Sequence, residues 1–273
     1  MPGTSHQKLW RNYRDFSGLR GQLVADIFAQ HLALKGATIL DAGCGSGGIS
    51  RALAERGAKV IAVDIHAMDA QKLGHARPTR ESLPGTQEIT WLNHSIETLT
   101  LEAACDGIVL WDVLEHLSEP LDALKILQRS LKNDGTLLIA TPNRGSWINA
   151  LCDPHYGLPL VSLLPRNQVR RIVAVWLGWH DRAKPDFPEL LSLAAIGRIL
   201  TGAGFSWRFI NRQVFAVAME NPRGLWNRSW HLHLIALVHR LGLTSLLGNL
   251  VSDRIGWMNR CTMPTFFILA RKR

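Results

Sequence analysis

Apolar residues along the chain follow two alternating patterns: short continuous runs, and longer stretches at helical spacing. The continuous runs predict buried strands at 38–40, 59–64, 89–92, 107–111, 136–140, 205–210 and 265–270. Helical spacing predicts helices over 8–34, 49–56, 121–131 and 189–201. Because strands that alternate with helices form βαβ units, the pattern predicts an α/β fold with a doubly wound, mostly parallel seven-stranded sheet.

Two long segments interrupt this alternation and predict helical insertions, 146–188 after the fifth strand and 212–262 after the sixth. The rest of the chain divides into N-terminal helices (1–37), a core (38–145) and the end of the sheet (189–211 and 263–273). No internal repeat or low-complexity tract separates these parts, so residues 1–273 are expected to form a single domain.

Composition narrows the setting of the protein. The net charge of +9 favours anionic partners. Four cysteines without a C-x-x-C pair argue against a zinc site and a disulfide framework, and they predict a reducing cytoplasm. The N-terminus lacks the apolar region of a signal peptide, and no run of about 18 uncharged apolar residues occurs. Neither export nor a membrane span is therefore expected.

Residues 41–48, with the sequence DAGCGSGG, lie between the first predicted strand and a helix. Glycines let a backbone approach a ligand closely, and the free amides at a helix start attract negative charge. The glycines alone also fit the Gly-x-Gly-x-x-Gly fingerprint of dinucleotide sites, so they do not separate one adenosyl cofactor from another.

Two carboxylates narrow the choice of cofactor. Asp41 precedes the first glycine by two residues, where it would repel a pyrophosphate but attract an ammonium group, directly or through water. Asp64 ends the second strand, where an acid can accept hydrogen bonds from both ribose hydroxyls. Since Asp64 suits any adenosyl ligand, Asp41 is the discriminating residue.

With these motifs the chain resembles the class I S-adenosylmethionine-dependent methyltransferases, and among them the ubiquinone-biosynthesis O-methyltransferase group. The matching segments are ILDAGCGSG (39–47), VD (63–64), DVLEH (112–116) and LKNDGTL (131–137). The resemblance implies a Rossmann-like methyltransferase fold in which 38–145 is the cofactor-binding core. The cofactor it implies is S-adenosyl-L-methionine, with S-adenosyl-L-homocysteine as the product.

The resemblance also implies which residues contact the cofactor. The loop glycines would line its methionine and sugar portions, with Asp41 facing the amine and Asp64 the ribose. The segment 94–97 would flank the adenine, with Ser95 at the place where relatives usually carry an Asp. The implied contacts are Asp41, Gly43, Cys44, Gly45, Gly47, Asp64, Ile65, Ser95, Ile96, Trp111 and Asp112. The Cys44 thiol is assigned no chemistry.

Methyl transfer is an in-line displacement that needs alignment and a deprotonated acceptor. His116 is the first candidate base, because it follows the fourth strand at the carboxyl edge of the sheet. The alternative is that His116 packs beside the cofactor or orients a helix. The insertion 146–188 is expected to lie over the same edge and to build the acceptor pocket. His155 and Tyr156 are therefore further candidates, unless they are ordinary loop residues.

The ubiquinone group is similar in carrying acidic and His residues that can hold a divalent ion, which here would be Asp112, Glu115 and His116. Oxygen-rich sets of this kind suit Mg²⁺. Acids are also favoured at a helix start by the macrodipole, and we prefer that interpretation. Mg²⁺ is accordingly not expected, and no metal ligand is predicted.

Tryptophans and arginines concentrate in the last third of the chain. In the second insertion one helical stripe is expected to carry Trp226, Trp230, Leu234, Leu237 and Leu241. Such a helix can cover the acceptor pocket as a core-facing lid or lie on an anionic membrane surface. RNA binding by stacking is a third alternative, but nucleic acid is not the expected partner because no RNA-binding domain is recognisable.

The sequence therefore predicts a cytoplasmic methyltransferase that uses S-adenosylmethionine and modifies a small acceptor, hydrophobic or lipid-like, at oxygen. Peripheral membrane association is a further expectation. Two rival functions stay open: a nicotinamide-dependent oxidoreductase, which the glycines fit equally well, and a non-catalytic module that binds an adenosyl ligand.

Overall fold

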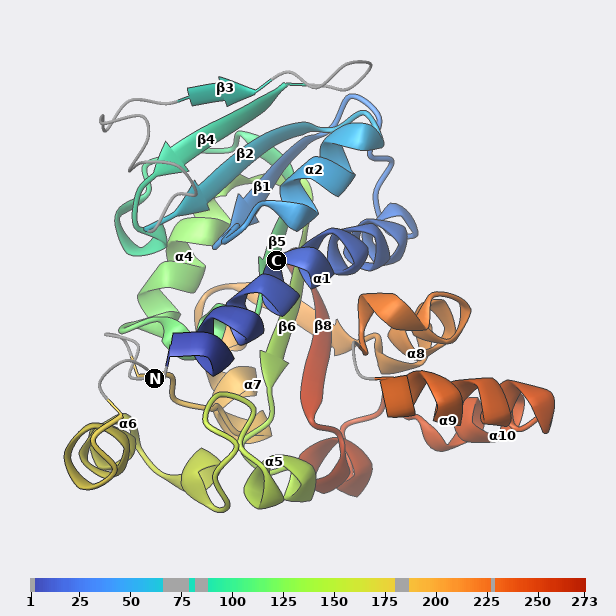
Figure 1. Ribbon diagram of the computed structural model, residues 1–273. Helices are drawn as coiled ribbons and strands as arrows, with labels where there is room; N and C mark the ends of the chain where they lie inside the picture. The colour runs from blue at the N-terminus through green and yellow to red at the C-terminus, as the bar shows by residue number, and fades with distance from the viewer. Residues whose placement is uncertain (1–2, 66–78, 82–87, 180–186, 227–228) are drawn as a thin grey trace.

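The centre of the computed structural model is an eight-stranded sheet in the order β3-β4-β2-β1-β5-β6-β8-β7 (Figure 1). The structure describes residues 3–65, 79–81, 88–179, 187–226 and 229–273. Strands β4, β2, β1, β5 and β6 pair in parallel, whereas β3 and β8 run antiparallel to their neighbours. The strands are β1 (Thr38–Ala42), β2 (Lys59–Asp64), β3 (Thr79–Glu81), β4 (Ile89–Asn93), β5 (Cys105–Trp111), β6 (Leu131–Pro142), β7 (Phe205–Phe209) and β8 (Thr265–Lys272).

All seven predicted strands are present, and the predicted doubly wound, mostly parallel sheet is confirmed. The prediction missed β3, which extends the sheet antiparallel to β4 at one edge. Its sequence, Thr-Arg-Glu, carries no apolar residue, so a search for apolar runs cannot find it.

Helices fill the connections between strands and both insertions. The helices are α1 (Gly3–Ala29), α2 (Gly48–Glu55), α4 (Pro120–Ser130), α5 (Trp147–Leu151), α6 (Arg166–Arg170), α7 (Leu193–Gly202), α8 (Asn211–Glu220), α9 (Ser229–Arg240) and α10 (Thr244–Leu250). The 3₁₀ and π-helical segments are η1 (Ile96–Thr98), η2 (Leu114–His116), η3 (Val161–Leu163), η4 (Arg171–Trp176), η5 (Pro222–Gly224) and η6 (Met258–Thr262). Within the described part of the chain, no helix has both the length and the apolar character needed to cross a membrane.

The two faces of the sheet bury separate cores, because successive residues of a strand point to opposite faces. Ile39 packs with α1, α2 and α8, whereas its neighbour Leu40 packs with α4 and α7. Figure 1 shows α1 and α2 on one side of the sheet and α4 on the other. The loops at the carboxyl ends of β1, β2 and β5 lie between these two helical layers, as expected for a doubly wound fold.

Helix α1 packs directly against the start of α2. A Cβ atom on Gly21 would lie 2.1 Å from the carbonyl oxygen of Gly48, and one on Gly48 would lie 2.2 Å from the carbonyl oxygen of Ser17. Only glycine allows two backbones to approach this closely. The N-terminal helix is therefore fixed beside the glycine-rich loop that precedes α2.

The second insertion is helical as predicted, but four of the five residues of its predicted stripe do not face the core. Trp230, Leu234, Leu237 and Leu241 are each at least half exposed, and in α9 only Ile235 is counted among the buried apolar residues. The α9 part of the stripe is therefore not core-facing, and of the two alternatives a contact with a membrane surface stays a prediction. Leu225 and Trp226, which precede α9, contact the core instead.

Candidate active site

The loop between β1 and α2 turns through three glycines with positive φ angles: 84° at Gly43, 49° at Gly45 and 77° at Gly47. A Cβ on Gly43 would lie 2.3 Å from Val113 Cγ2, so that glycine is required by packing as well as by its φ. A Cβ on Gly45 would meet no atom within 4 Å. The loop is thus closed against the protein at Gly43 and open at Gly45, where a ligand can approach the backbone.

Asp64 stands at the open side of this loop, at the end of β2. Its Oδ2 accepts a hydrogen bond from the backbone N–H of Gly45 at 2.9 Å, which fixes the carboxylate beside the glycines. The next residue, Ile65, leaves 57% of its side chain exposed although it is apolar. A carboxylate followed by an exposed apolar surface suits the ribose and the adenine of an adenosyl ligand.

Two further predicted contacts lie beside this site, after β4. The Ser95 hydroxyl caps η1 by accepting a hydrogen bond from the N–H of Glu97 at 3.2 Å. Ile96 is buried in the core on the α4 side, and Cys44 is buried on the α1 side. Burial raises the pKa of the Cys44 thiol far above its usual range, so this thiol stays protonated.

Asp41 is buried beneath the loop, with only 1% of its surface exposed. Its Oδ2 accepts a hydrogen bond of 2.5 Å from the hydroxyl of Ser50 in α2. Burial raises the pKa of Asp41 to about 7, the Ser50 hydrogen bond opposes the rise, and the nearby charge of Asp64 adds to it. The loop therefore rests on an acid that changes charge near neutral pH, and its contact with an amine stays a prediction.

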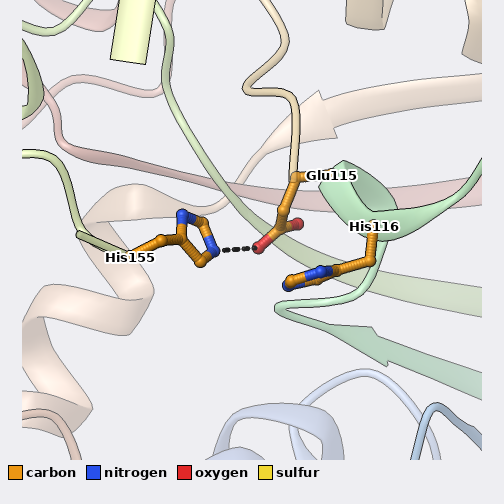
Figure 2. Close-up of side chains that lie close together, drawn as sticks. All are labelled: Glu115, His116 and His155. Carbon is orange, nitrogen blue, oxygen red and sulfur yellow. Dashed lines mark ion pairs between the residues drawn. The ribbon is translucent and has the colours of Figure 1, made fainter. Parts of the chain in front are cut away.

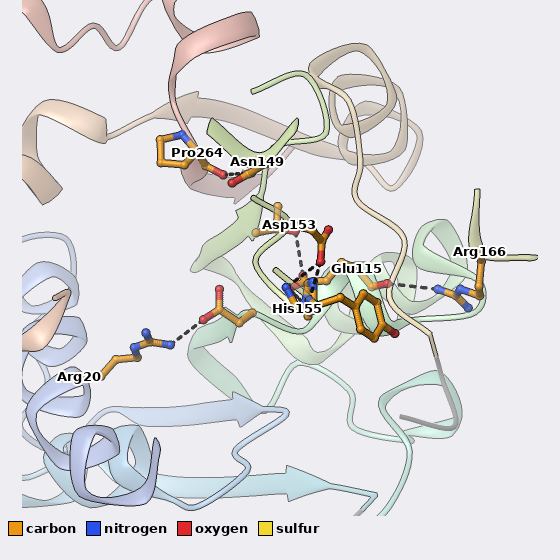
Figure 3. Close-up of polar contacts among 10 residues, drawn as sticks. Arg20, Glu115, Asn149, Asp153, His155, Arg166 and Pro264 are labelled. Carbon is orange, nitrogen blue, oxygen red and sulfur yellow. Dashed lines mark hydrogen bonds and ion pairs between the residues drawn. The ribbon is translucent and has the colours of Figure 1, made fainter. Parts of the chain in front are cut away.

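At the end of β5, Asp112 has a φ of 55°, which is unusual for a residue other than glycine. Its Oδ2 is 2.7 Å from a guanidinium nitrogen of Arg20 in α1, as Figure 3 shows for the pair at its left. The Arg20 guanidinium also lies over the ring of Phe16, 4.8 Å from its centroid. Strained backbone of this kind persists only where neighbouring groups hold it, and it is common at functional sites.

A cavity of about 300 Å³ opens beside Asp112. Its wall is mainly apolar and comes from the ends of β5 and β8, from α8 and from the second insertion. The lining residues are Arg20, Trp111, Asp112, Asn211, Val214, Phe215, Leu225, Trp226, Val251, Met263, Pro264, Thr265 and Phe267. Of the described residues of the first insertion, 146–179 and 187–188, none lines this cavity. That this insertion lies over the acceptor site stays a prediction.

The residues predicted for proton transfer gather in a separate polar cluster (Figure 2). Nε2 of His155 lies 3.8 Å from Oε1 of Glu115, and the His116 and His155 rings meet edge to face with centroids 5.3 Å apart. Oε2 of Glu115 accepts a hydrogen bond of 2.9 Å from the hydroxyl of Thr141. Segments far apart in the sequence thus bring a buried carboxylate between two imidazoles, an arrangement that can accept and hold a proton.

A buried aspartate holds the turn that presents His155 and Tyr156. Oδ1 of Asp153 accepts hydrogen bonds from the backbone N–H groups of both residues, at 2.9 and 2.8 Å (Figure 3). Burial raises the pKa of Asp153, while these two hydrogen bonds oppose the rise. The rings of His155 and Tyr156 lie 6.4 Å apart. The structure therefore groups all three predicted catalytic candidates.

The metal-ligand set implied by the family resemblance is not assembled in this arrangement. Asp112 pairs with Arg20, whereas Glu115, His116 and His155 each offer one ligand atom within 4.8 Å of one another. Two imidazoles and one carboxylate suit a transition metal better than Mg²⁺. The preference for no Mg²⁺ site stays a prediction.

Sequence reasoning missed several residues of the site. Arg20 is 92 positions from Asp112 and looks like an ordinary helical arginine. Trp91 contacts the loop, since a Cβ on Gly47 would lie 2.4 Å from its ring, and the Arg51 guanidinium lies 5.4 Å from the centroid of that ring. Of the missed residues, only Ser50 had a usable signal, because it lies in the first turn of the helix that follows the loop.

Residues 12–208 match the family model described as a methyltransferase domain. A ubiquinone biosynthesis O-methyltransferase of Xanthomonas campestris is 35% identical over 121 residues, which are 44% of this chain and 48% of that protein. One from Nitrosospira multiformis is 28% identical over 181 residues, or 64% of this chain and 65% of that protein. The chain thus spans about half to two thirds of the length of these curated relatives.

Solved structures agree on the fold. An S-adenosylmethionine-dependent methyltransferase from Mesorhizobium loti superposes with a TM-score of 0.54 at 19% identity, covering 90% of this chain and 96% of that one. A protein from Listeria monocytogenes, described as a methyltransferase of the same kind, gives a TM-score of 0.53 at 14% identity, covering 93% and 98%. At these identities the likeness concerns the fold alone.

Proposed function

The chain belongs to the methyltransferase domain family, and on that premise we propose that it transfers a methyl group from S-adenosylmethionine to a small apolar acceptor, at oxygen. The observation that carries the proposal is the glycine loop, open at Gly45 and flanked by two acids, Asp41 and Asp64. Two carboxylates disfavour a pyrophosphate and favour a ligand with a cationic amine. This charge pattern speaks against the nicotinamide alternative.

The loop residues fit the cofactor on geometric grounds. The open space at Gly45 admits a ligand to the backbone, Asp64 can bind a ribose, and the exposed Ile65 can cover an adenine. S-adenosylmethionine, when bound, supplies a methyl group on a sulfonium, which is an electrophile. The protein then has to align the acceptor and remove its proton.

The cavity beside Asp112 is the place that we propose for the body of the acceptor. Its wall of Phe215, Trp226 and Phe267 suits an aromatic or lipid-like molecule, and Asp112 with Arg20 supplies polar groups on one side. Trp111 ends β5 and Asp112 follows it, and β5 pairs with β1, which leads into the glycine loop. The acceptor and the methyl donor would therefore meet at the carboxyl end of β5.

His116 is the base that we propose for the acceptor hydroxyl. His155 and the buried Glu115 lie beside it in one cluster. Asp112 is the alternative base, since it lines the cavity whereas His116 does not.

Isothermal titration calorimetry with S-adenosylhomocysteine tests the cofactor assignment. We expect one site per chain, no response to NADH, and at least roughly tenfold weaker binding for Asp64→Asn because that variant loses a carboxylate at the ribose. Asp106→Asn is the matched control, because it makes the same substitution away from the glycine loop. Asp106 accepts hydrogen bonds from the backbone N–H of Thr38 and from the Lys132 ammonium group. Binding of NADH without binding of S-adenosylhomocysteine would overturn the proposal.

Methyl transfer itself needs a second measurement, because a non-catalytic module would also bind the ligand. Metabolite and lipid extracts incubated with cofactor labelled in the methyl group should yield a labelled product, and Asp64→Asn should yield less of it when the cofactor is below saturation. Binding without any labelled product would favour the non-catalytic module.

A further inference from the structure

The helix α5 buries its polar side chain and exposes its apolar ones, which is the opposite of an ordinary surface helix. Its polar residue Asn149 is buried, and its Nδ2 donates hydrogen bonds to the carbonyl oxygens of Asn143 and Pro264 at 2.9 and 2.7 Å (Figure 3). Its apolar residues Trp147, Ile148 and Leu151 leave 62%, 56% and 76% of their side chains exposed. The polar residue thus anchors α5 and the apolar residues point to the outside.

Neighbouring segments extend this apolar surface. Trp257 is 61% exposed and meets Trp147 edge to face, with ring centroids 6.2 Å apart, and Ile255 beside it is 66% exposed. Leu160, whose N–H donates to the carbonyl oxygen of Ala150 at the end of α5, is 62% exposed at a φ of 64°. An exposed leucine in left-handed backbone is unfavourable both in hydration and in conformation.

We define the apolar rim as Trp147, Ile148, Leu151, Leu160, Ile255 and Trp257, and we propose that it docks the protein on the surface of an anionic lipid bilayer. Large aromatic and aliphatic side chains exposed together mark an interaction surface. Tryptophan is the residue favoured at the level of lipid headgroups. The rim comes from short separate segments, so it can lie on a bilayer and enter its outer few ångströms, which is what monotopic binding needs.

Charge around the rim favours anionic lipid over a second copy of the chain. The exposed side chains of Arg254 and Arg260 flank Ile255 and Trp257. The one acidic residue of the segment 252–262 is Asp253, whose Oδ1 accepts a hydrogen bond from the backbone N–H of Arg212. In a symmetric dimer through the rim, arginines would face arginines, while anionic headgroups attract them.

The position of the rim links membrane docking to the acceptor, and this link rests on the proposed function. The segment 252–262 carries Ile255 and Trp257, and it joins Val251 to Met263, both of which line the cavity beside Asp112. Docking through the rim would therefore place the wall of the cavity next to lipid. An apolar acceptor dissolved in the bilayer could then enter without crossing water.

Vesicle flotation tests the docking surface directly. We expect the full chain to float with vesicles of equimolar phosphatidylcholine and phosphatidylglycerol, and to float far less with phosphatidylcholine alone. Trp147→Ser/Trp257→Ser should lower partitioning at least about tenfold, because two large apolar side chains no longer leave water. Arg254→Glu/Arg260→Glu should lower binding to the anionic vesicles alone.

The matched control is Lys59→Glu/Arg129→Glu, which makes the same change in charge on exposed residues at the start of β2 and in the last turn of α4. This variant should float like the unchanged protein; a loss equal to that of the Arg254 and Arg260 variant would overturn the proposal. Two other results would overturn the proposal. One is that the unchanged protein does not float. The other is that sedimentation shows a dimer of the unchanged protein, which is lost in the tryptophan variant, while neither protein binds vesicles.

Calorimetry with S-adenosylhomocysteine on the same variants separates the two proposals and shows that each variant is folded. Cofactor binding and methyl transfer without flotation would overturn the docking surface and leave the proposed function in place. Flotation without cofactor binding would overturn the proposed function and leave the docking surface in place.

Discussion

The two sides of the carboxyl edge of the sheet are built in different ways. The cofactor side is made largely by backbone: the loop conformation at Gly43 and Gly45 and one hydrogen bond from an N–H to Asp64. The acceptor side is made by side chains that come from α1, both insertions and the start of β8. A backbone site is encoded in a few consecutive residues, whereas a side-chain site is distributed over the chain.

Charge is also arranged differently on the two sides. On the cofactor side, burial raises the pKa of Asp41, and the nearby charge of Asp64 adds to the rise. On the acceptor side Asp112 is paired with Arg20, and Glu115 lies near His155. Cationic ligand groups are therefore favoured on the first side, and a nearly neutral molecule is suited to the second.

The largest expected effect separates chemistry from cofactor binding. His116→Gln should lower kcat by roughly 10²–10⁴-fold, because the acceptor would lose its base. Its affinity for S-adenosylhomocysteine in calorimetry should change less than about twofold, since His116 is outside the loop. An unchanged kcat would remove His116 as the base and leave Asp112. Loss of activity on chelation in the unchanged protein would point to a metal on Glu115, His116 and His155.

Two alanine variants test whether backbone alone makes the cofactor side. Gly43→Ala should lower the free energy of unfolding by about 2–4 kcal/mol, because its Cβ would strike Val113 at a positive φ. Gly45→Ala should cost only about 1 kcal/mol of strain, since its Cβ meets open space, but it should weaken cofactor binding by filling that space. Equal stabilities in urea denaturation would contradict this view of the loop.

The pKa of Asp41 makes a prediction about pH. Burial raises that pKa to about 7, so the folded protein binds this proton more tightly than the unfolded chain does. The free energy of unfolding should then fall as pH rises from about 4 to about 7, and Asp41→Asn should be more stable than the unchanged protein above pH 7, by about 2–4 kcal/mol.

Cofactor affinity should respond to Asp41 in the opposite direction. Ionised Asp41 attracts an amine, so binding of S-adenosylhomocysteine should strengthen as pH rises through 7 in the unchanged protein and stay flat in Asp41→Asn. Ser50→Ala serves as the control: it removes the hydrogen bond that favours the ionised form and should move the midpoint to higher pH. Identical pH profiles for all three proteins would exclude this role of Asp41.

The smallest expected effect concerns the wall of the cavity. Phe215→Ala should raise KM for the acceptor by about 5–30-fold through lost apolar contact, with cofactor affinity unchanged. Leu237→Ala, in the same insertion but on the exposed stripe of α9, should leave KM as it is. Equal effects of the two substitutions would mean that the cavity does not hold the acceptor.

The contrast between a site made of backbone and a site made of side chains also explains which features the sequence predicts. The strands and the loop are predicted because an apolar run or a glycine spacing is local information. Arg20 and the cavity could not be predicted, because their partners are brought together only by tertiary folding. The role of the stripe of α9 was left between alternatives, because amphipathic spacing shows that a helix has an apolar face without showing where that face points. His155 was found from its place in an insertion, but its contact with Glu115 was not.

The strand β8 lies between β6 and β7, and among the strands that the structure describes it is the only neighbour of β7. On the ribosome, β7 is made before β8 and has no edge to join until segment 210–264 and then β8 have been synthesised. At roughly 5–20 residues per second this delay lasts seconds, during which the open edge of β6 and the apolar residues of the second insertion are available to chaperones. Synonymous codons that slow or speed translation of 210–264 would thus be expected to alter the yield of folded protein without changing a residue.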